Sequence, residues 1–386
     1  MNVIKIGFTL IAKVLIKSFY FVSKSLFPVN PKKITFASYR SEKIQDNLDY
    51  VYQEIRQRNV NYSFVFLFKT YKKSILGKTN YLFHMIRASF HLATSRCVFI
   101  DDYYFPIYVI KPRNGTEIIQ LWHAAGAFKK FGYSTTDKSY GPSQTYLQHV
   151  KVHSNYTKVM VSGKIVIPAY AEAFNMPQNR ILSLGVPRID FFYQKERHIK
   201  LRARFFEHFP ELKGKKLILY APTYRGKSHG QNLIDCPLDV KTLKTILGEK
   251  YALLVHLHPY MHGKMKVPIN NNFSYNIDDF SIQDLMVVSD LLITDYSSVI
   301  FDYSLLVRPM AFFSYDLDDY LKERDFYYDY QTFIPGPMFK ETQSLAKWIQ
   351  SEQFDLDVIK QFRDRFFDYQ DGKNSERIVN NILANK

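Results

Sequence analysis

The feature that most constrains the fold is an alternation of short apolar, β-branched runs with helical stretches, which occurs twice along the chain. Strands that alternate with helices favour a parallel sheet covered by helices. The first series of strand candidates is Lys33–Ala37, Tyr62–Phe68, Cys97–Asp101, Glu117–Trp122, Lys158–Val161 and Arg180–Leu184, and the second is Lys216–Tyr220, Tyr251–Leu257, Leu291–Thr294 and Met310–Phe313. The sequence therefore predicts an α/β fold with two Rossmann-like domains in tandem.

The length of 386 residues fits two domains that each bury a hydrophobic core. A charged stretch from Gln194 to Lys216 separates the two series of strands. We place the domains at residues 31–205 and 206–386, preceded by a segment of residues 1–30. The residues after about Glu341 have a helical pattern and belong to the second domain in this interpretation.

The charge indicates an anionic partner. The chain has 52 Lys and Arg against 36 Asp and Glu, a formal net charge of +16, which suits a phosphorylated ligand, a nucleic acid or an acidic membrane surface. Cys97 and Cys236 are too few for a disulfide framework, and neither has a neighbouring Cys that would suggest a zinc site. A reducing cytosol is the simplest compartment for such a chain.

Residues 3–27 predict an amphipathic helix that lies in a membrane interface. On a helical wheel Lys13, Lys17 and Lys24 fall within about 40° of one another, opposite a wide apolar face. The lysines would reach phosphate headgroups while apolar side chains such as Phe19 enter the acyl boundary. A helix packed on its own domain is the alternative. A membrane-spanning helix is not expected, because no window offers about 18 uninterrupted apolar residues.

Polar residues at strand ends locate the predicted chemistry, because two open α/β sheets in tandem place a ligand crevice at the carboxyl ends of their strands. His123 leaves the run Glu117–Trp122 and enters a turn of small residues. The backbone N–H groups of such a turn suit a base that acts beside a phosphate. The alternative role for a histidine at a strand end is a structural hydrogen bond.

Two histidines end a strand of the second series. Strand alternation puts His256 and His258 on one face, and Pro259 ends the strand directly after them. Such a pair suits a phosphate or a metal ion. A metal site would need further ligands, for which His262 and Asp295 are the candidates, although no spacing marks these residues as a closed set.

Two other strand ends suit an anionic ligand. Thr223 and Arg225 follow Lys216–Tyr220 and provide a hydroxyl and a two-pronged donor for phosphate oxygens. Ser297 or Ser298 would cap the next helix, and Asp302 lies one helical turn further on the same face, where it would accept hydrogen bonds from ribose hydroxyls. An ordinary capped helix is the alternative.

These residues together resemble the CDP-glycerol glycerophosphotransferase family of wall teichoic acid synthesis. The strings that carry the resemblance, in order, are LWHAAGAFKKFG, GVPRID, YAPTYR, HLHP, TDYSSVIFDY and the later Phe312–Tyr320 with Pro335-Gly336-Pro337. The match runs from about Lys33 to about Pro337. The resemblance implies a GT-B-like architecture and transfer of glycerol phosphate from CDP-glycerol to an acceptor with release of CMP. It implies no catalytic metal and no cofactor.

The resemblance also implies residue roles. His123 would be the catalytic base that takes a proton from the acceptor hydroxyl, and His258 the second essential histidine, which stabilises the pyrophosphate or the departing CMP. The implied substrate-binding residues are Trp122, Ala124, Ala125, Gly126, Arg188, Pro222, Thr223, Arg225, His256, Asp295, Ser297, Ser298 and Asp302. Two positions depart from the family pattern: Ala124 stands where many members have Gly, and His256 where many have Arg.

Within the family, the HAAGA string favours the priming enzyme. The expected acceptor is the undecaprenyl-diphosphate-linked disaccharide of N-acetylmannosamine and N-acetylglucosamine, and addition of a later glycerol phosphate is the alternative. We expect peripheral attachment to the cytoplasmic face of the membrane, no nucleic acid partner and contact with other wall teichoic acid enzymes. The rival classes are a metal-dependent hydrolase and a basic lipid-binding or nucleic-acid-binding protein.

Overall fold

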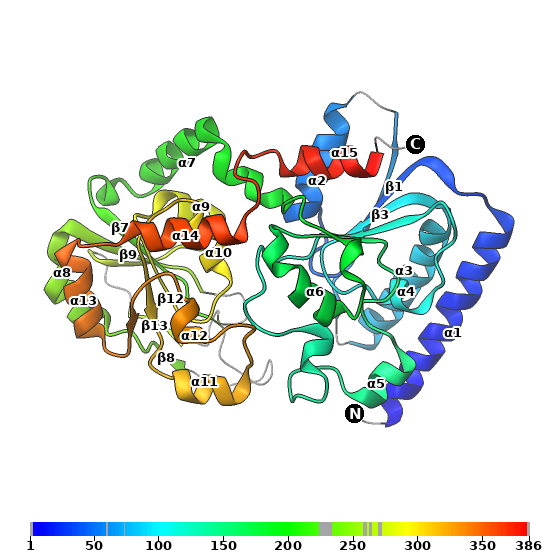
Figure 1. Cartoon of the computed structure of the whole chain (residues 1–386), viewed down its shortest axis with the longest axis horizontal. Helices are drawn as coiled ribbons and strands as arrows, with labels where there is room; N and C mark the ends of the chain where they lie inside the picture. Colours follow the sequence, from blue (N-terminus) through cyan, green and yellow to red (C-terminus); the bar gives the residue numbers. More distant parts are fainter. Residues whose placement is uncertain are drawn as a thin grey trace. The chain divides into compact units, whose positions relative to one another are not determined.

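The computed structural model describes residues 3–58, 61–72, 74–223, 234–257, 261, 265–268 and 272–383. The chain divides into two compact units, the first formed by Met1–Phe191 with Phe367–Lys386 and the second by Phe192–Phe366 (Figure 1). Each unit contains a six-stranded parallel sheet with helices, so the predicted α/β fold with two sheets is confirmed. The units differ from the predicted ranges 31–205 and 206–386, because helix α7 (Lys195–His208) belongs to the second unit and the C-terminal residues return to the first.

The first unit is built on a sheet with the strand order β2-β1-β3-β4-β5-β6. Its strands are β1 (Asn30–Ser38), β2 (Ser63–Phe68), β3 (Ser95–Ile100), β4 (Glu117–Gln120), β5 (Lys158–Met160) and β6 (Ile181–Leu182). Its helices are α1 (Val3–Leu26), α2 (Asp46–Gln57), α3 (Ile75–Thr94), α4 (Phe105–Val109), α5 (Gln144–His149), α6 (Ile167–Phe174) and α15 (Asn374–Leu383), with 3₁₀ turns η1 (Gly132–Thr135), η2 (Lys164–Val166), η3 (Gln178–Arg180) and η4 (Pro187–Tyr193), the last of which runs into the second unit.

The C-terminal helix completes the core of the first unit. Ile378, Val379 and Ile382 of α15 pack in one cluster with apolar residues of α2 and of the central strands. Asp190 holds the start of this helix, because its carboxylate accepts hydrogen bonds from the backbone N–H groups of Asn374 and Ser375, both at 2.8 Å. Part of the GVPRID string therefore has a structural role that joins residues distant in the sequence.

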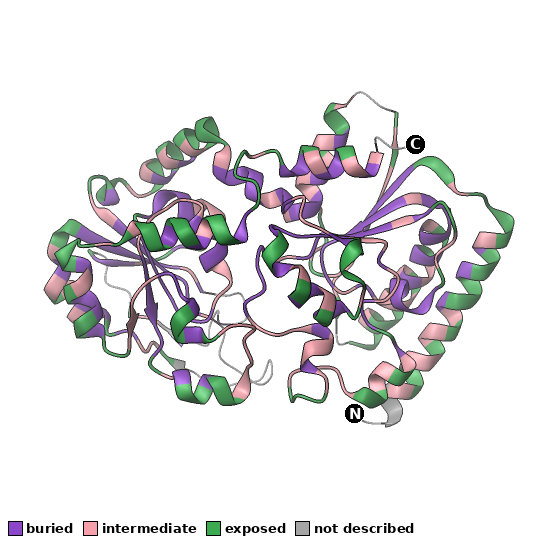
Figure 2. Cartoon of the chain, viewed as in Figure 1, coloured by how far each residue is buried: buried purple, intermediate pink, exposed green. Residues whose placement is uncertain are grey.

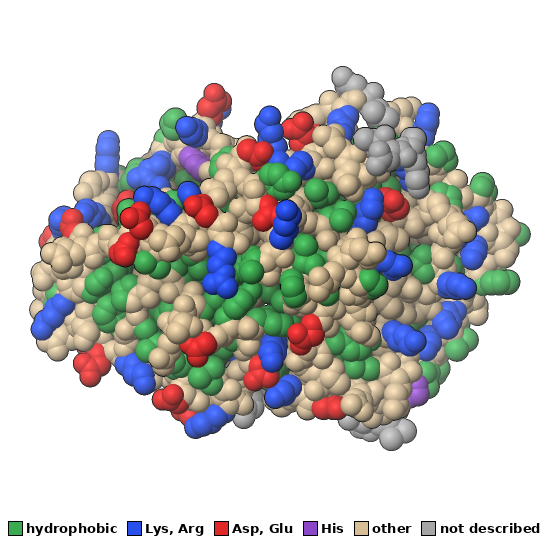
Figure 3. Space-filling model, viewed as in Figure 1, with side chains coloured by type: hydrophobic (Ala, Val, Ile, Leu, Met, Phe, Trp, Pro, Cys, Tyr) green, Lys and Arg blue, Asp and Glu red, His purple; other side chains and the backbone are tan. Residues whose placement is uncertain are grey.

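Helix α1 has apolar side chains on two faces. Ile16 and Tyr20 are buried on the face that contacts α3, whereas Phe8 is 71% and Val14 62% exposed on the opposite side. Apolar side chains and lysines lie along the edge of the molecule where Figure 1 places α1 (Figure 3). The sequence suggested either a membrane-facing helix or a helix packed on its own domain, and the structure combines a packed face with an exposed apolar face.

The length and composition of residues 6–26 are those of a helix that can cross a membrane. This observation differs from our expectation that no segment would qualify, because the mean hydropathy of the window tolerates the interrupting lysines. It is weak support for a span, since core helices and signal sequences meet the same criteria. Lys13 does not belong to an open basic stripe, because its ammonium group donates to the carbonyl oxygen of His149.

The second unit is built on a sheet with the strand order β11-β9-β7-β12-β13-β14, and β8 and β10 form a separate pair. Its strands are β7 (Lys216–Tyr220), β8 (Ile234–Asp235), β9 (Tyr251–Val255), β10 (Met265–Lys266), β11 (Ser274–Asn276), β12 (Leu291–Thr294), β13 (Met310–Phe313) and β14 (Met338–Phe339). Its helices are α7, α8 (Val240–Leu247), α9 (Ile282–Val288), α10 (Val299–Ser304), α11 (Leu317–Glu323), α12 (Tyr330–Phe333), α13 (Thr342–Ser351) and α14 (Leu356–Phe366), with 3₁₀ turns η5 (Pro210–Leu212) and η6 (Gly248–Lys250).

Each sheet has one point at which the strand order reverses. In the first unit β1 is flanked by β2 and β3, and in the second unit β7 is flanked by β9 and β12. The central strands are buried on both faces (Figure 2), which explains their nearly continuous apolar sequences. Open α/β sheets bind ligands at the carboxyl ends of the strands beside such a reversal. The topology therefore directs attention to the residues that follow β1, β3, β7 and β12.

We predict that Gly185→Ala detaches the C-terminal helix from the first unit. Gly185 has a φ of +98°, and an added Cβ would lie 1.9 Å from Oδ1 of the buried Asn374. Gly115 is a matched control, because its φ is +88° but nothing lies within 4 Å of an added Cβ. In urea denaturation Gly185→Ala should lose about 1–3 kcal/mol more unfolding free energy than Gly115→Ala. Equal losses would contradict this account.

Candidate active site

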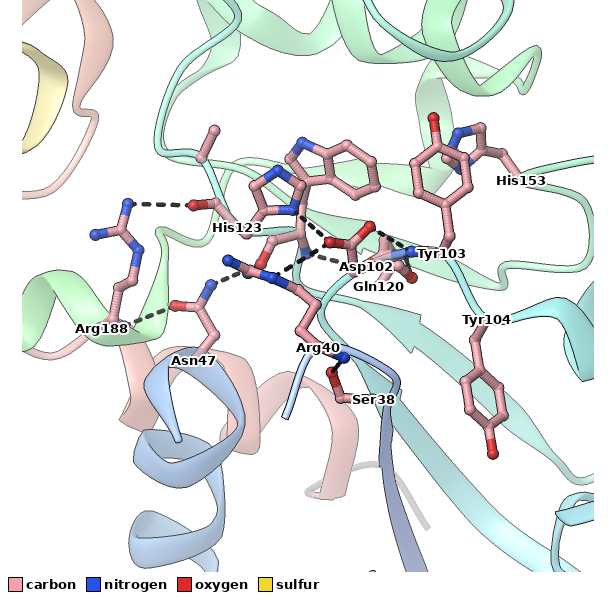
Figure 4. A network of polar contacts seen from close by, with 12 residues as sticks. Ser38, Arg40, Asn47, Asp102, Tyr103, Tyr104, Gln120, His123, His153 and Arg188 are labelled. Atoms are coloured by element: carbon pink, nitrogen blue, oxygen red, sulfur yellow. Dashed lines mark hydrogen bonds and ion pairs between the residues drawn. The ribbon is translucent and has the colours of Figure 1, made fainter. Parts of the chain in front are cut away.

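A buried carboxyl group lies at the strand reversal of the first unit. Asp102 follows β3, and its Oδ2 is 3.4 Å from Nε of Arg40, which follows β1. The same oxygen is 3.3 Å from Nδ1 of His123, which follows β4. The other carboxyl oxygen accepts a hydrogen bond of 2.6 Å from the backbone N–H of Tyr103. The ends of three neighbouring strands thus meet at one carboxyl group (Figure 4).

The backbone that carries His123 is fixed on both sides. Trp122 has a positive φ of 53°, and its N–H donates to Oε1 of Gln120 at 2.8 Å. Its carbonyl oxygen accepts a 2.7 Å hydrogen bond from the amide of Asn47 at the start of α2. The oxygen of the same amide accepts from the backbone N–H of Arg188 at 2.9 Å. These contacts join α2, the turn after β4 and the GVPRID string around the histidine.

The ring of His123 rests on Trp122. The two ring centroids are 4.4 Å apart with an interplanar angle of 29°, and on its other flank Trp122 stacks on Phe131 at 5.1 Å. About a third of the His123 side chain is exposed, with a relative accessibility of 36%. Because Nδ1 faces Asp102, Nε2 is the ring nitrogen available for proton transfer with a ligand. A nitrogen base held by a carboxyl group is the arrangement of a general base and its orienting partner.

Burial controls the protonation of this pair. It lowers the pKa of His123 to about 3, the charges of Arg40 and Arg188 act in the same direction, and a hydrogen bond with the backbone of Asp101 opposes them. Burial raises the pKa of Asp102 to about 7, although Arg40 and the N–H of Tyr103 oppose the rise. The imidazole is therefore neutral at neutral pH, which is the form that accepts a proton. An ionised Asp102 would stabilise the imidazolium once it forms.

The small-residue turn after His123 is less open than its sequence suggested. Trp122, Ala125 and Gly126 are buried, and Ala124 is partly buried. The carbonyl oxygen of Ala124 accepts a 3.0 Å hydrogen bond from the hydroxyl of Tyr170, and that of Ala125 accepts one from Ser162. These residues were predicted to contact the substrate, and in the structure they make contacts within the protein. Trp122, for example, supports the ring of His123.

Arg188, which was predicted to contact the donor, lies beside His123 in the first unit. Its backbone N–H is bonded to Asn47, and its guanidinium group donates to the carbonyl oxygen of His123 at 3.5 Å (Figure 4). The side chain is partly exposed. A cation is thus held beside the predicted base.

In the second unit, predicted residues also meet at the strand reversal. Asp295 follows β12, and its Oδ1 accepts a 2.8 Å hydrogen bond from the backbone N–H of Thr223, which follows β7. Asp295 and Pro222 are buried, whereas Thr223 is partly exposed. His256 follows β9, and its backbone N–H donates to the carbonyl oxygen of Tyr220 at 3.0 Å. Asp295 thus holds two strand ends together in this unit.

The start of α10 differs from the predicted cap. Ser298 is the N-cap residue, yet its side chain makes no capping hydrogen bond, because its backbone is already helical with φ −70° and ψ −3°. The hydroxyl of Ser297 accepts a long hydrogen bond of 3.4 Å from Val299 instead. Asp302 is 4% exposed, which leaves little of its surface for a ribose hydroxyl.

Three residues of the sequence-based interpretation lie outside the described residues: His258, Arg225 and His262. The role of His258 as a second essential histidine, the phosphate contact of Arg225 and the alternative metal site therefore stay predictions. Within the part of the chain that the structure describes, no group of three or more His, Cys, Asp and Glu side chains is placed to hold a metal ion.

Comparison with known proteins decides the family. The sequence profile of the CDP-glycerol:poly(glycerophosphate) glycerophosphotransferases matches residues 18–384. The chain belongs to this family. The resemblance inferred from the motifs is thereby confirmed. The relatives of the chain include primases of teichoic acid synthesis.

Two relatives and one solved structure show how similar the chain is to known proteins. The chain is 46% identical to the teichoic acid ribitol-phosphate primase of Bacillus spizizenii (strain W23) over 97% of both chains. It is 31% identical to the teichoic acid glycerol-phosphate primase of Bacillus subtilis (strain 168), over 78% of this chain and 76% of that one. The solved structure of the wall teichoic acid polymerase TagF has a TM-score of 0.78 at 24% identity, covering 97% of this chain and 93% of its own, and confirms the two-domain α/β fold.

Three residues of the centre were missed in the sequence: Asp102, Arg40 and Asn47. The pair Asp101-Asp102 directly follows a strand candidate, and this position was a usable signal, because carboxylates at strand ends beside a reversal are frequent site residues. Arg40 and Asn47 carry no comparable pattern. Their position becomes evident only when the sheet order places β1 beside β3.

We predict that His123 stays neutral over the physiological range. Its ring resonances in NMR should show no protonation between about pH 8 and about pH 5, because burial and two neighbouring cations disfavour the imidazolium. Arg40→Gln removes one of these cations and should raise the pKa of His123. Arg56→Gln, which removes an exposed cation elsewhere on α2, should leave it unchanged. A titration of His123 near 6.5 in the unaltered protein would refute the proposed electrostatics.

Proposed function

We propose that the protein is a priming transferase that moves an alditol phosphate from a CDP-activated donor to a lipid-linked acceptor in teichoic acid synthesis. The observation that carries the proposal is the neutral His123 held by Asp102 at the strand reversal, in a chain of this family. The acceptor in this proposal is the undecaprenyl-diphosphate-linked disaccharide of N-acetylmannosamine and N-acetylglucosamine. Likeness to a primase over nearly the whole of both chains supports the priming role.

Two alditols are candidates for the transferred group. The motifs favoured glycerol phosphate, as in CDP-glycerol, and a 31% identical relative is a glycerol-phosphate primase. The 46% identity to a ribitol-phosphate primase supports ribitol phosphate more strongly. We therefore propose CDP-ribitol as the first donor to test and CDP-glycerol as the second. If the donor is CDP-ribitol, the acceptor in this proposal is the lipid-linked disaccharide to which glycerol phosphate has already been added.

The proposed reaction is a displacement at phosphorus. The acceptor hydroxyl oxygen forms a bond to the phosphorus that bears the alditol, and the bond from that phosphorus to the bridging pyrophosphate oxygen breaks. CMP leaves with the bridging oxygen, and the hydroxyl proton passes to Nε2 of His123. Asp102 stabilises the resulting imidazolium through Nδ1, at the observed 3.3 Å. A positioned base of this kind contributes about 10²–10⁴-fold in rate.

Positive charge is needed because an electron-rich oxygen attacks an anionic pyrophosphate. Arg40 and Arg188 supply it beside His123 in the first unit. We assign the CDP moiety to the carboxyl-edge loops of the second unit, with Thr223, His256 and Ser297 as described members. On the basis of the sequence alone, we assign His258 and Arg225 to the same CDP-binding loops.

The test is a transfer assay that varies donor and acceptor separately. Purified protein is incubated with labelled CDP-ribitol or CDP-glycerol and with lipid-linked disaccharides that carry zero, one or two glycerol phosphates. We expect release of CMP and growth of the acceptor by one unit. His123→Ala should lower turnover by about 10²–10⁴-fold while donor binding survives.

His149→Ala is the matched control for this variant, because His149 is a partly exposed histidine of α5 in the same unit. It should keep the turnover of the unaltered protein. Transfer from neither donor to any acceptor would overturn the proposed function. An active His123→Ala variant would overturn the assignment of the base alone.

We also propose peripheral attachment to the cytoplasmic face of the membrane through α1. The supporting observation is the row of exposed apolar side chains on the outer side of this helix, which includes Phe8, Val14 and Phe19. Lys17 and Lys24 are placed beside that row on the helical wheel, where they suit anionic headgroups. A lipid-linked acceptor makes such a location useful, because the enzyme and the acceptor then share a surface.

Vesicle binding checks this attachment. Phe8→Glu with Val14→Glu should reduce co-sedimentation with anionic vesicles by at least about tenfold, because each charge must be kept out of the acyl region. The control is Ile199→Glu, at a residue of α7 in the second unit that is 69% exposed. Unchanged binding of the double variant, or equal loss in the control, would contradict attachment through α1.

A further inference from the structure

The first unit contains a pocket whose walls are mostly tyrosine. Its volume is about 490 Å³, and nine residues line it. Six of them are tyrosines, namely Tyr39, Tyr81, Tyr103, Tyr108, Tyr140 and Tyr146, and the others are a phenylalanine, a proline and a valine. The size lies within the range of small-molecule sites. All six tyrosines lie outside the motifs of the predicted site.

The chemistry of the lining excludes one class of ligand and favours another. Lys, Arg, Asp and Glu are absent from the nine described lining residues, so the walls offer no countercharge to a phosphate. Burial raises the pKa of Tyr81 to about 12, which keeps this phenol neutral. Aromatic faces pack against apolar C–H surfaces, and phenol hydroxyls exchange hydrogen bonds. A neutral ring that bears several hydroxyl groups matches both properties.

The pocket shares two walls with the surroundings of the His123–Asp102 pair. The phenol of Tyr39 is hydrogen-bonded to Asp102, and the backbone N–H of Tyr103 donates to the same carboxyl group at 2.6 Å. The ring of Tyr103 lies 5.6 Å from that of Trp122, on which His123 stacks. A ligand in the pocket is therefore next to residues that contact Asp102 and Trp122, and these two residues in turn contact the proposed base.

On the side formed by Tyr81 of α3, the pocket adjoins an exposed aromatic residue that precedes this helix. Tyr81 belongs to the lining, and its ring packs edge-on against Tyr71 at 5.5 Å. Tyr71 is 52% exposed. Exposed aromatic surface therefore adjoins one side of the pocket, and contacts of Asp102 adjoin another. A lipid-linked ligand whose sugar lies in the pocket would have its apolar portion near the exposed side.

We propose that this tyrosine-lined pocket binds the neutral sugar portion of the lipid-linked acceptor, beside the Asp102–His123 pair. The inference rests on the proposed function and extends it, because it assigns the acceptor subsite. The tyrosines are binding residues, and the proton transfer remains with His123.

Kinetics of Tyr146→Ala and Tyr146→Phe test the subsite. Tyr146 is partly exposed in α5, so its truncation is compatible with folding, which thermal melting verifies. Tyr146→Ala should raise KM for the lipid-linked disaccharide by about tenfold or more, with KM for the CDP-alditol unchanged. Tyr146→Phe keeps the ring and should have a smaller effect. Tyr133→Ala is the control, since Tyr133 is partly exposed in the neighbouring η1 turn and does not line the pocket.

Binding of a soluble disaccharide separates this proposal from the proposed function. Calorimetry with N-acetylmannosaminyl-N-acetylglucosamine should show binding to the unaltered protein and about tenfold weaker binding to Tyr146→Ala. This result supports the pocket even if neither CDP-alditol is a donor. An unchanged acceptor KM and unchanged disaccharide affinity in Tyr146→Ala, or a change in donor KM alone, would overturn the subsite.

Discussion

The contact on which the first unit's site depends is the meeting of three strand ends at the buried carboxyl group of Asp102. A carboxylate in this position is costly unless it is paired and hydrogen-bonded. Arg40, the N–H of Tyr103 and the phenol of Tyr39 provide these partners. Because the same oxygen that faces Arg40 also faces His123, the interaction that satisfies the carboxyl group also orients the base. The Asp102 carboxyl group therefore both joins the strand ends and contacts the proposed base.

The sequence predicted the sheets better than the site, for a physical reason. All ten strand candidates correspond to strands, because strands buried on two faces require apolar residues throughout, and such runs are visible in a single sequence. The short strands β8, β10, β11 and β14 were missed, since two or three residues carry no periodicity.

The position of a candidate residue at a strand reversal was predictable where a motif and a strand end coincide, as at His123 and Thr223. Contacts that join elements distant in the sequence were not predictable. In the GVPRID string Arg188 stands beside the histidine, whereas Gly185 and Asp190 hold the C-terminal helix. A motif shows that several residues occur together, but it does not separate those that face a ligand from those that face the protein. In this string the contacts separate the two groups: the backbone of Arg188 is bonded to Asn47 near His123, whereas Gly185 and Asp190 face Asn374 of α15.

The return of the chain to the first unit has a consequence for synthesis on the ribosome. The core that supports β1 and α2 includes Ile378, Val379 and Ile382, and these residues are translated after the entire second unit. The second unit, residues 192–366, is contiguous and its chain is complete earlier. The first unit, which carries the Asp102–His123 pair, finishes its core only after α15 has left the exit tunnel. Formation of this core is thereby coupled to completion of the polypeptide, and a chain that stops before α15 lacks part of it.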